Sequence, residues 1–234
     1  MSSFDAKTTT MLEWLAGFGA AAAAELADVV GLSEQTAVTR LRRLERRALV
    51  AQVRLLHGKP ALYLITRLGL RTTGRDDLAP VRLSSAGFLH AYECARVARA
   101  LQRSLDGRFT VHSERELRAW ERAAGGLIAS TELSFSSAAR ADVHRPDLVC
   151  CAAPGVARAL PLAVEVELTI KAPARLRAIV RGWARCRRIG GVVYYATPAV
   201  ARALERAVAE ERAEQAVTVL TLDLAGRLAR SAID

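Results

Sequence analysis

Apolar residues recur at helical spacing through the first fifty residues and predict three helices. The first covers about Thr8–Gly17. The second covers Ala23–Val30 and ends at Gly31, as a left-handed glycine cap would end it. Ser33 is a suitable N-cap for a third helix over about Glu34–Ala48.

Two short apolar runs follow and predict a β-hairpin. They cover Val50–Leu56 and Ala61–Thr66, with the turn His57-Gly58-Lys59-Pro60 between them. The polar stretch Arg71–Pro80 contains Gly and Pro and predicts a linker. A long amphipathic helix is then expected over about Ser85–Leu105.

Strand-like and helix-like segments alternate over the rest of the chain and predict an α/β sheet. Strands are expected at Arg108–His112, Leu148–Cys151, Leu160–Thr169, Gly191–Thr197 and Ala216–Leu222. Helices are expected at Glu114–Ala123, Arg175–Ile189 and Pro198–Glu214. The sequence therefore predicts an α/β protein of two domains, residues 8–76 and 84–234.

The positive charge is concentrated in one segment. The 234 residues carry a net charge of +10. Between Thr36 and Arg75 there are ten basic residues and one acidic residue, Glu45, so this segment alone carries +9. Such a local bias is typical of a nucleic-acid-binding face, and a solvated basic helix is the alternative.

The third predicted helix has a polar and basic outer face. A short helix, a glycine turn and such a helix form a helix-turn-helix pattern. Polar and basic side chains near the helix start reach base edges in the major groove, and later arginines suit phosphates. The face and the hairpin beside it offer these candidate DNA contacts: Gln35, Thr36, Thr39, Arg40, Arg43, Arg46, His57 and Lys59.

The stretch Gly31–Glu45, followed by a hairpin and then Thr66–Gly69, resembles the winged helix-turn-helix superfamily. The resemblance implies that the N-terminal domain binds double-stranded DNA, with the hairpin as its wing. A winged helix used for protein contacts is the alternative.

Two carboxylates interrupt an apolar strand of the second domain. Glu165 and Glu167 lie two positions apart and so share one face of the strand. Unpaired carboxylates in a low-dielectric site are unfavourable, so a divalent metal or a basic partner is expected. Asp147 precedes the neighbouring strand and would complete a three-carboxylate metal site suited to Mg²⁺ or Mn²⁺. The alternative is a structural ion network with arginines of the helix over Arg175–Arg188.

Pro146-Asp147, followed by the segment from Glu165 to Lys171, resembles the PD-(D/E)xK nuclease motif. The resemblance implies a restriction-endonuclease-like α/β fold and metal-assisted phosphodiester hydrolysis. The family's lysine lies two residues after its Glu. Here Glu167 occupies that position, which leaves Lys171 as the substitute.

The family also draws a Glu from its first helix, which here is Glu114 or Glu116. The resemblance thus implies these candidate catalytic residues: Asp147, Glu165, Glu167, Lys171 and Glu114. Because the lysine is displaced, a nuclease-like domain without catalysis, kept for binding or dimerisation, is equally compatible.

The order of features over residues 8–215 resembles the replication-relaxation family, which is associated with plasmids and mobile elements. The resemblance rests on the winged helix, the linker, the long helix, Ser113–Leu117, Arg145–Asp147 and Val164–Lys171. It implies a DNA-binding protein of plasmid replication or transfer, or a transcription regulator. A Mg²⁺- or Mn²⁺-dependent DNA endonuclease or nickase is the alternative function.

Other classes of protein find no support in the sequence. No apolar stretch is long enough for a membrane span, and the polar N-terminus is unlike a secretory signal. The four cysteines have no C-x-x-C spacing, which favours reduced thiols and a cytoplasmic location. No P-loop, Rossmann glycine pattern or Ser/His/Asp order points to a small-molecule substrate. A homodimer is compatible with the long helix.

Overall fold

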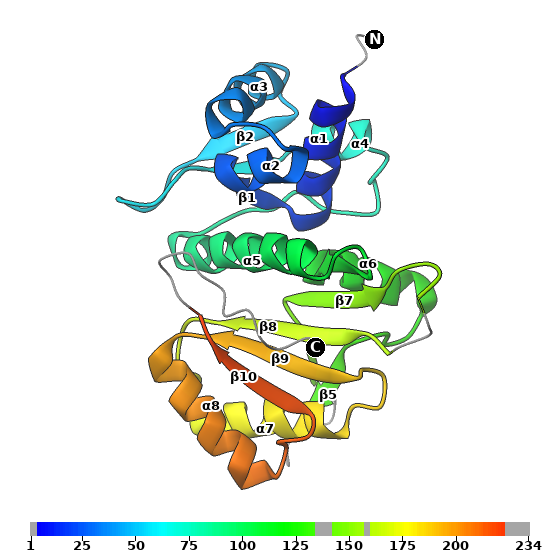
Figure 1. Ribbon diagram of the computed structural model, residues 1–234, viewed down its shortest axis with the longest axis vertical. Helices are drawn as coiled ribbons and strands as arrows, with labels where there is room; N and C mark the ends of the chain where they lie inside the picture. The colour runs from blue at the N-terminus through cyan, green and yellow to red at the C-terminus, as the bar shows by residue number, and fades with distance from the viewer. Residues whose placement is uncertain (1–3, 134–141, 157–159, 223–234) are drawn as a thin grey trace. The chain divides into compact units, whose positions relative to one another are not determined.

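The computed structural model describes residues 4–133, 142–156 and 160–222 and confirms the mixed α/β class (Figure 1). The chain divides into two compact units, Met1–Arg99 and Ala100–Asp234, here called the N-terminal unit and the C-terminal unit. The division falls within the long helix α5 (Ser85–Ser104), whereas the sequence places the start of the second domain at residue 84. The difference arises because Phe88 of α5 is fully buried among residues of the N-terminal unit.

The N-terminal unit is built from helices around a small antiparallel sheet with strand order β1-β3-β2. Its elements before α5 are α1 (Ala6–Phe18), β1 (Ala20–Ala22), α2 (Ala23–Val30), α3 (Glu34–Arg46), β2 (Val50–Val53), β3 (Leu62–Ile65) and α4 (Arg67–Thr72). The three predicted helices and the hairpin are confirmed, with ends that differ by a few residues. The strand β1 was not predicted, because an alanine run carries no strand pattern of its own.

Local signals set the ends of these helices. The Ser33 hydroxyl accepts a hydrogen bond from the Thr36 amide and caps α3, as predicted. Gly31 ends α2 with a φ of 61°, a conformation that glycine adopts without strain. At Gly69 of α4, a Cβ atom would lie 2.2 Å from the Leu49 carbonyl oxygen, so only glycine permits this close approach.

The C-terminal unit contains a mixed five-stranded sheet with order β10-β9-β8-β7-β4. β8, β9 and β10 run parallel to one another. β7 pairs antiparallel with β8 on one side and with β4 on the other. Its elements after α5 are β4 (Phe109–Ser113), α6 (Glu114–Ala124), β5 (Thr131–Leu133), β6 (Asp142–His144), β7 (Leu148–Ala152), β8 (Leu162–Glu167), α7 (Pro173–Arg185), β9 (Gly191–Ala196), α8 (Pro198–Glu211) and β10 (Val217–Thr221).

α7 and α8 pack beside each other against the sheet (Figure 1). Trp183 of α7 and Leu204 of α8 are fully buried in the same core as Tyr194 of β9. α7 ends at Arg185, four residues before the predicted end at Ile189, because Cys186 adopts an extended conformation. The separate hairpin β5-β6 was not predicted, since its strands are too short to show a period.

No helix among the described residues is long and apolar enough to cross a membrane.

Candidate functional site

The outer face of α3 is exposed and basic. Gln35, Thr36 and Thr39 lie near its start and are exposed, as the sequence predicts. Arg43 and Arg46 follow on the same helix and are also exposed. Neither arginine has a salt bridge to a carboxylate among the described residues, so both guanidinium groups are available to an anionic partner.

Two further arginines of this region were not among the predicted DNA contacts. Arg42 is exposed on α3, and Arg47 follows the helix with its guanidinium 4.2 Å from the centre of the Phe4 ring. The local excess of arginine was the sequence signal that could have identified both.

A groove of about 520 Å³ lies between the start of α1 and the outer face of α3. Its lining is mostly polar or basic and consists of Phe4, Asp5, Thr8, Thr36, Thr39, Arg40, Arg43, Leu44 and Arg47. The groove brings four of the predicted DNA contacts of α3, Thr36, Thr39, Arg40 and Arg43, to one surface of the N-terminal unit.

Arg40 lies on this surface but is bound within the protein. Its guanidinium forms a salt bridge with Asp5, the N-cap of α1, and donates a hydrogen bond to the Thr8 hydroxyl at 2.7 Å. The sequence groups Arg40 with the base-contacting residues. The structure instead gives it the role of joining α3 to the start of α1.

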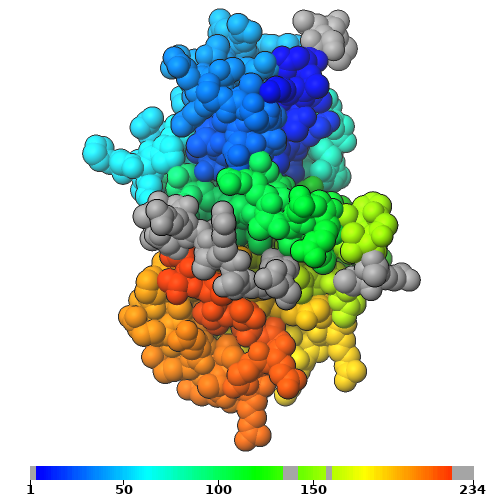
Figure 2. All heavy atoms as spheres, viewed as in Figure 1, coloured from blue at the N-terminus to red at the C-terminus, as the bar shows by residue number. Residues whose placement is uncertain are grey.

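The connection between β2 and β3 protrudes from the N-terminal unit (cyan in Figures 1 and 2). His57 lies in it and is exposed. Lys59 is half-buried, and its Nζ lies 5.8 Å from the centre of the Tyr92 ring of α5. Of the two candidate contacts in the β2-β3 connection, His57 is the more accessible.

The ion pair of Arg40 gives a testable pH dependence. The hydrogen bond from Arg40 and that from the Thr8 amide lower the pKa of Asp5 from 3.8 to about 2. The ionised carboxylate is therefore favoured in the folded state. Its contribution to stability is present above pH 3.8 and is lost as the pH falls through about 2.

We expect carboxyl-carbon NMR of the wild-type protein to show Asp5 titrating near pH 2, and Arg40→Gln to move this pKa back toward 3.8. Arg43→Gln is the control and should leave the Asp5 pKa unchanged. An Asp5 that titrates normally in the wild-type protein would contradict the role of Arg40 as an internal partner.

The second candidate site is an acidic cluster on β8 in the C-terminal unit. Glu165 and Glu167 are both buried, and the register of the parallel pair sets Glu165 opposite Tyr194 of β9. Asp147, just before β7, accepts a hydrogen bond from the Val166 amide at 2.8 Å. The predicted carboxylates thus lie on adjacent strands.

Glu165 is bound by two side chains that the sequence analysis did not identify. Its Oε1 atom lies 2.6 Å from His144 Nε2 and accepts a hydrogen bond from Trp183 Nε1 at 3.1 Å. Burial raises the pKa of Glu165, and the negative charge of Asp147 adds to this rise, whereas the contact with His144 opposes it. The carboxylate therefore depends on His144 for its stability in the ionised form.

The Tyr194 hydroxyl completes this buried group. It has no hydrogen-bond acceptor among the described residues, and burial raises its pKa well above the ordinary value. His144, Trp183 and Tyr194 come from β6, α7 and β9, so only their meeting in space could reveal them.

Lys171 forms a salt bridge with Glu167, four residues earlier in the chain. Burial lowers the pKa of Lys171, while the nearby charges of Glu165 and Asp147 oppose that change. The structure therefore does bring Lys171 to the acidic cluster, as the substitute lysine of the nuclease motif would require.

Two of the arginines that the ion-network hypothesis assigns to the cluster pair with other carboxylates. Arg175 pairs with Asp142 at 2.6 Å, and Arg177 pairs with Glu210 at 3.4 Å. At the acid pair itself, Glu165 contacts His144 and Glu167 forms its salt bridge with Lys171.

The two candidate glutamates in the first turn of α6 both have partners within the same helix end. Glu114 pairs with Arg118 one turn later. Glu116 is buried and forms a capping box with Ser113. The Glu114 amide donates to the Asp147 carbonyl oxygen at 2.8 Å, so this helix begins beside the cluster without directing a carboxylate to it.

The three predicted metal-binding carboxylates do not form one common ligand group among the described residues. Among the described residues, Asp147, Glu165 and Glu167 do not bring one oxygen each to within 4.8 Å of one another. Each carboxylate is instead directed at a group of the protein: the Val166 amide, His144 with Trp183, and Lys171.

No protein-family model and no curated protein matches this chain.

Proposed function

We propose that this chain is a double-stranded DNA-binding protein whose N-terminal unit is a winged helix-turn-helix and whose α3 enters the major groove. The exposed face of α3 carries this proposal, because its arginines Arg42, Arg43 and Arg46 have no carboxylate partner among the described residues. The element order from α1 to β3 and the protruding β2-β3 connection support it (Figure 1).

In this proposal Gln35, Thr36 and Thr39 lie at the end of α3 that reaches base edges, and the later arginines contact phosphates. His57 of the wing adds a contact to the adjacent backbone. Lys59 and Arg40 support these elements from within the N-terminal unit. As the resemblance to the replication-relaxation family implies, we place this binding in the replication, transfer or regulation of a plasmid or mobile element.

We propose further that the C-terminal unit is nuclease-like but does not cleave DNA. The three carboxylates of the motif are bound by protein groups and do not converge on a common point. The alternative, a metal-dependent endonuclease or nickase, is favoured by one observation, the presence of Lys171 at the cluster.

Incubation of supercoiled plasmid with the full chain in Mg²⁺, Mn²⁺ or EDTA tests both proposals. We expect retarded but intact DNA in every lane, with affinity that falls steeply with salt because several phosphate contacts release counterions. A salt-independent interaction would contradict DNA binding through α3. Metal-dependent nicking that Asp147→Ala abolishes would establish the nuclease instead.

A further inference from the structure

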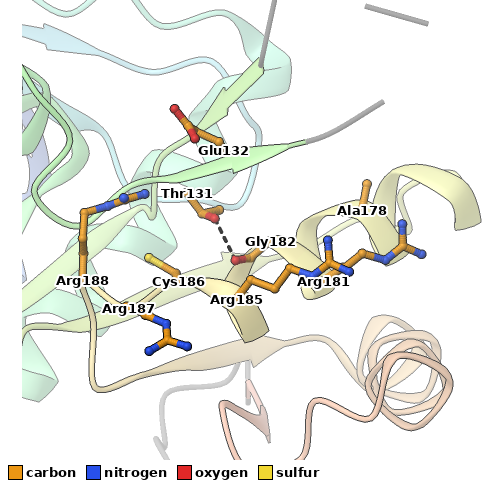
Figure 3. A pocket seen from close by; sticks show the side chains of 9 residues that line it. All are labelled: Thr131, Glu132, Ala178, Arg181, Gly182, Arg185, Cys186, Arg187 and Arg188. Carbon is orange, nitrogen blue, oxygen red and sulfur yellow. Dashed lines mark hydrogen bonds between the residues drawn. The ribbon is translucent and has the colours of Figure 1, made fainter. Parts of the chain in front are cut away.

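The C-terminal unit contains a cavity of about 310 Å³ lined by arginines. It is formed by β5, the C-terminal half of α7 and the turn that follows α7 (Figure 3). Its lining residues are Thr131, Glu132, Ala178, Arg181, Gly182, Arg185, Cys186, Arg187 and Arg188.

The charge of this arginine cavity is unbalanced, because four arginines and a single carboxylate, Glu132, line it. Arg181 forms a two-pronged salt bridge with Glu211, at 2.8 and 2.7 Å. Arg185 and Arg187 are exposed, and neither has a hydrogen bond or salt bridge among the described residues. An anion at the cavity would therefore relieve repulsion between the guanidinium groups.

The wall of the arginine cavity is held by contacts within the protein. The buried Thr131 hydroxyl donates to the Gly182 carbonyl oxygen at 2.8 Å and joins β5 to α7. The Arg188 guanidinium donates two hydrogen bonds to the Ser130 carbonyl oxygen, at 3.2 and 2.9 Å, which fixes it in place without neutralising its charge. These contacts hold the wall of the arginine cavity in place.

The helix dipole of α7 explains only some of the arginines that line the cavity. Cations are favoured at the C-terminus of a helix, which accounts for Arg185 in the last turn of α7. It does not account for Arg187 and Arg188, which lie beyond the helix end. Guanidinium groups bind phosphate in a planar, two-pronged geometry, so several around one polar cavity favour a phosphate ligand.

We propose that the arginine cavity binds the phosphate backbone of nucleic acid, with Arg185 and Arg187 as the contacting residues. The choice of nucleic acid over a free phosphate rests on the proposed DNA-binding function. The cavity is then a phosphate-binding surface separate from α3 and without base specificity, since it offers charge and no groove-reading element.

Residue-resolved NMR of the side-chain Nε–Hε groups of the full chain tests this proposal during titration with a short duplex at low salt. We expect the signals of Arg185 and Arg187 to move with the duplex. Signals of Arg43 and Arg46 report the proposed function in the same titration. If only the signals of Arg43 and Arg46 move, the arginine-cavity proposal has failed. If only the signals of Arg185 and Arg187 move, the proposed role of α3 has failed.

Variants give a second readout. Arg185→Ala/Arg187→Ala is expected to reduce the slope of log K against log salt by about 0.9 for each phosphate that the variant no longer neutralises, for every DNA sequence alike. Arg202→Ala/Arg206→Ala on α8 removes the same charge from exposed positions outside the cavity and should leave the slope unchanged.

Equal effects of the two double variants would overturn the proposal, because net charge alone would then explain the weaker salt dependence. A last titration, with inorganic phosphate, distinguishes a free anion from the DNA backbone. Signals of Arg185 and Arg187 that move with phosphate but not with the duplex would also overturn it, since the cavity would then bind a small free anion.

Discussion

Arg43→Ala/Arg46→Ala is expected to weaken duplex binding, and to weaken it about equally for every DNA sequence, since both arginines are assigned to phosphates. Both side chains are exposed on α3 and have no carboxylate partner among the described residues. Their removal takes away the proposed contacts to DNA without breaking a salt bridge within the described part of the protein. Fluorescence anisotropy with a labelled duplex at fixed salt measures the change.

The control for this prediction is Arg202→Ala/Arg206→Ala, which lowers the net charge equally from exposed positions on α8. Thermal unfolding should show the same stability for both double variants, because surface substitutions of this kind change the free energy of unfolding by about 0.5 kcal/mol or less. Undiminished affinity of Arg43→Ala/Arg46→Ala would remove α3 as the recognition helix.

His144→Ala is expected to destabilise the protein by about 1–3 kcal/mol, because it leaves an oxygen of the buried Glu165 carboxyl group without its hydrogen-bond partner His144. Glu165 is almost fully buried at 5% exposure, and Trp183 would be its one remaining side-chain hydrogen-bond donor among those described. Urea denaturation followed by circular dichroism measures the destabilisation.

A double variant separates the effect of the His144–Glu165 contact on stability from the effect of the packing around these two side chains. His144→Leu/Glu165→Leu removes both polar partners and is expected to recover much of the stability, since replacing both partners of a buried hydrogen bond by apolar groups is often nearly neutral. If His144→Ala leaves the unfolding midpoint unchanged, Glu165 does not depend on His144.

Addition of Mn²⁺ to the wild-type protein tests the same cluster against the metal alternative. A ligand that binds only the folded state raises the melting temperature. We expect no rise, because the carboxylates are bound by protein groups. A rise that Asp147→Asn abolishes would contradict the internal network and return the cluster to the metal-site hypothesis.

Much of the architecture follows from local patterns. The apolar stripe and the Ser33 cap define α3, and the capping box at Ser113 and Glu116 marks the start of α6. The alternation of strands and helices after residue 105 correctly predicts every strand of the five-stranded sheet. The three short strands β1, β5 and β6 were missed, because three residues form a strand only when a partner is beside them.

The sequence by itself determined which side chains are candidates: the basic face of α3 and the acid pair of β8 follow from helical and strand periods, which are local. The tertiary structure decided what those side chains contact. Arg40 meets Asp5 from 35 residues away, and Glu165 meets His144 and Trp183 from two other elements. Periodicity sets the face on which a residue lies, whereas its partners depend on long-range packing, which here brings protein groups to each of these carboxylates.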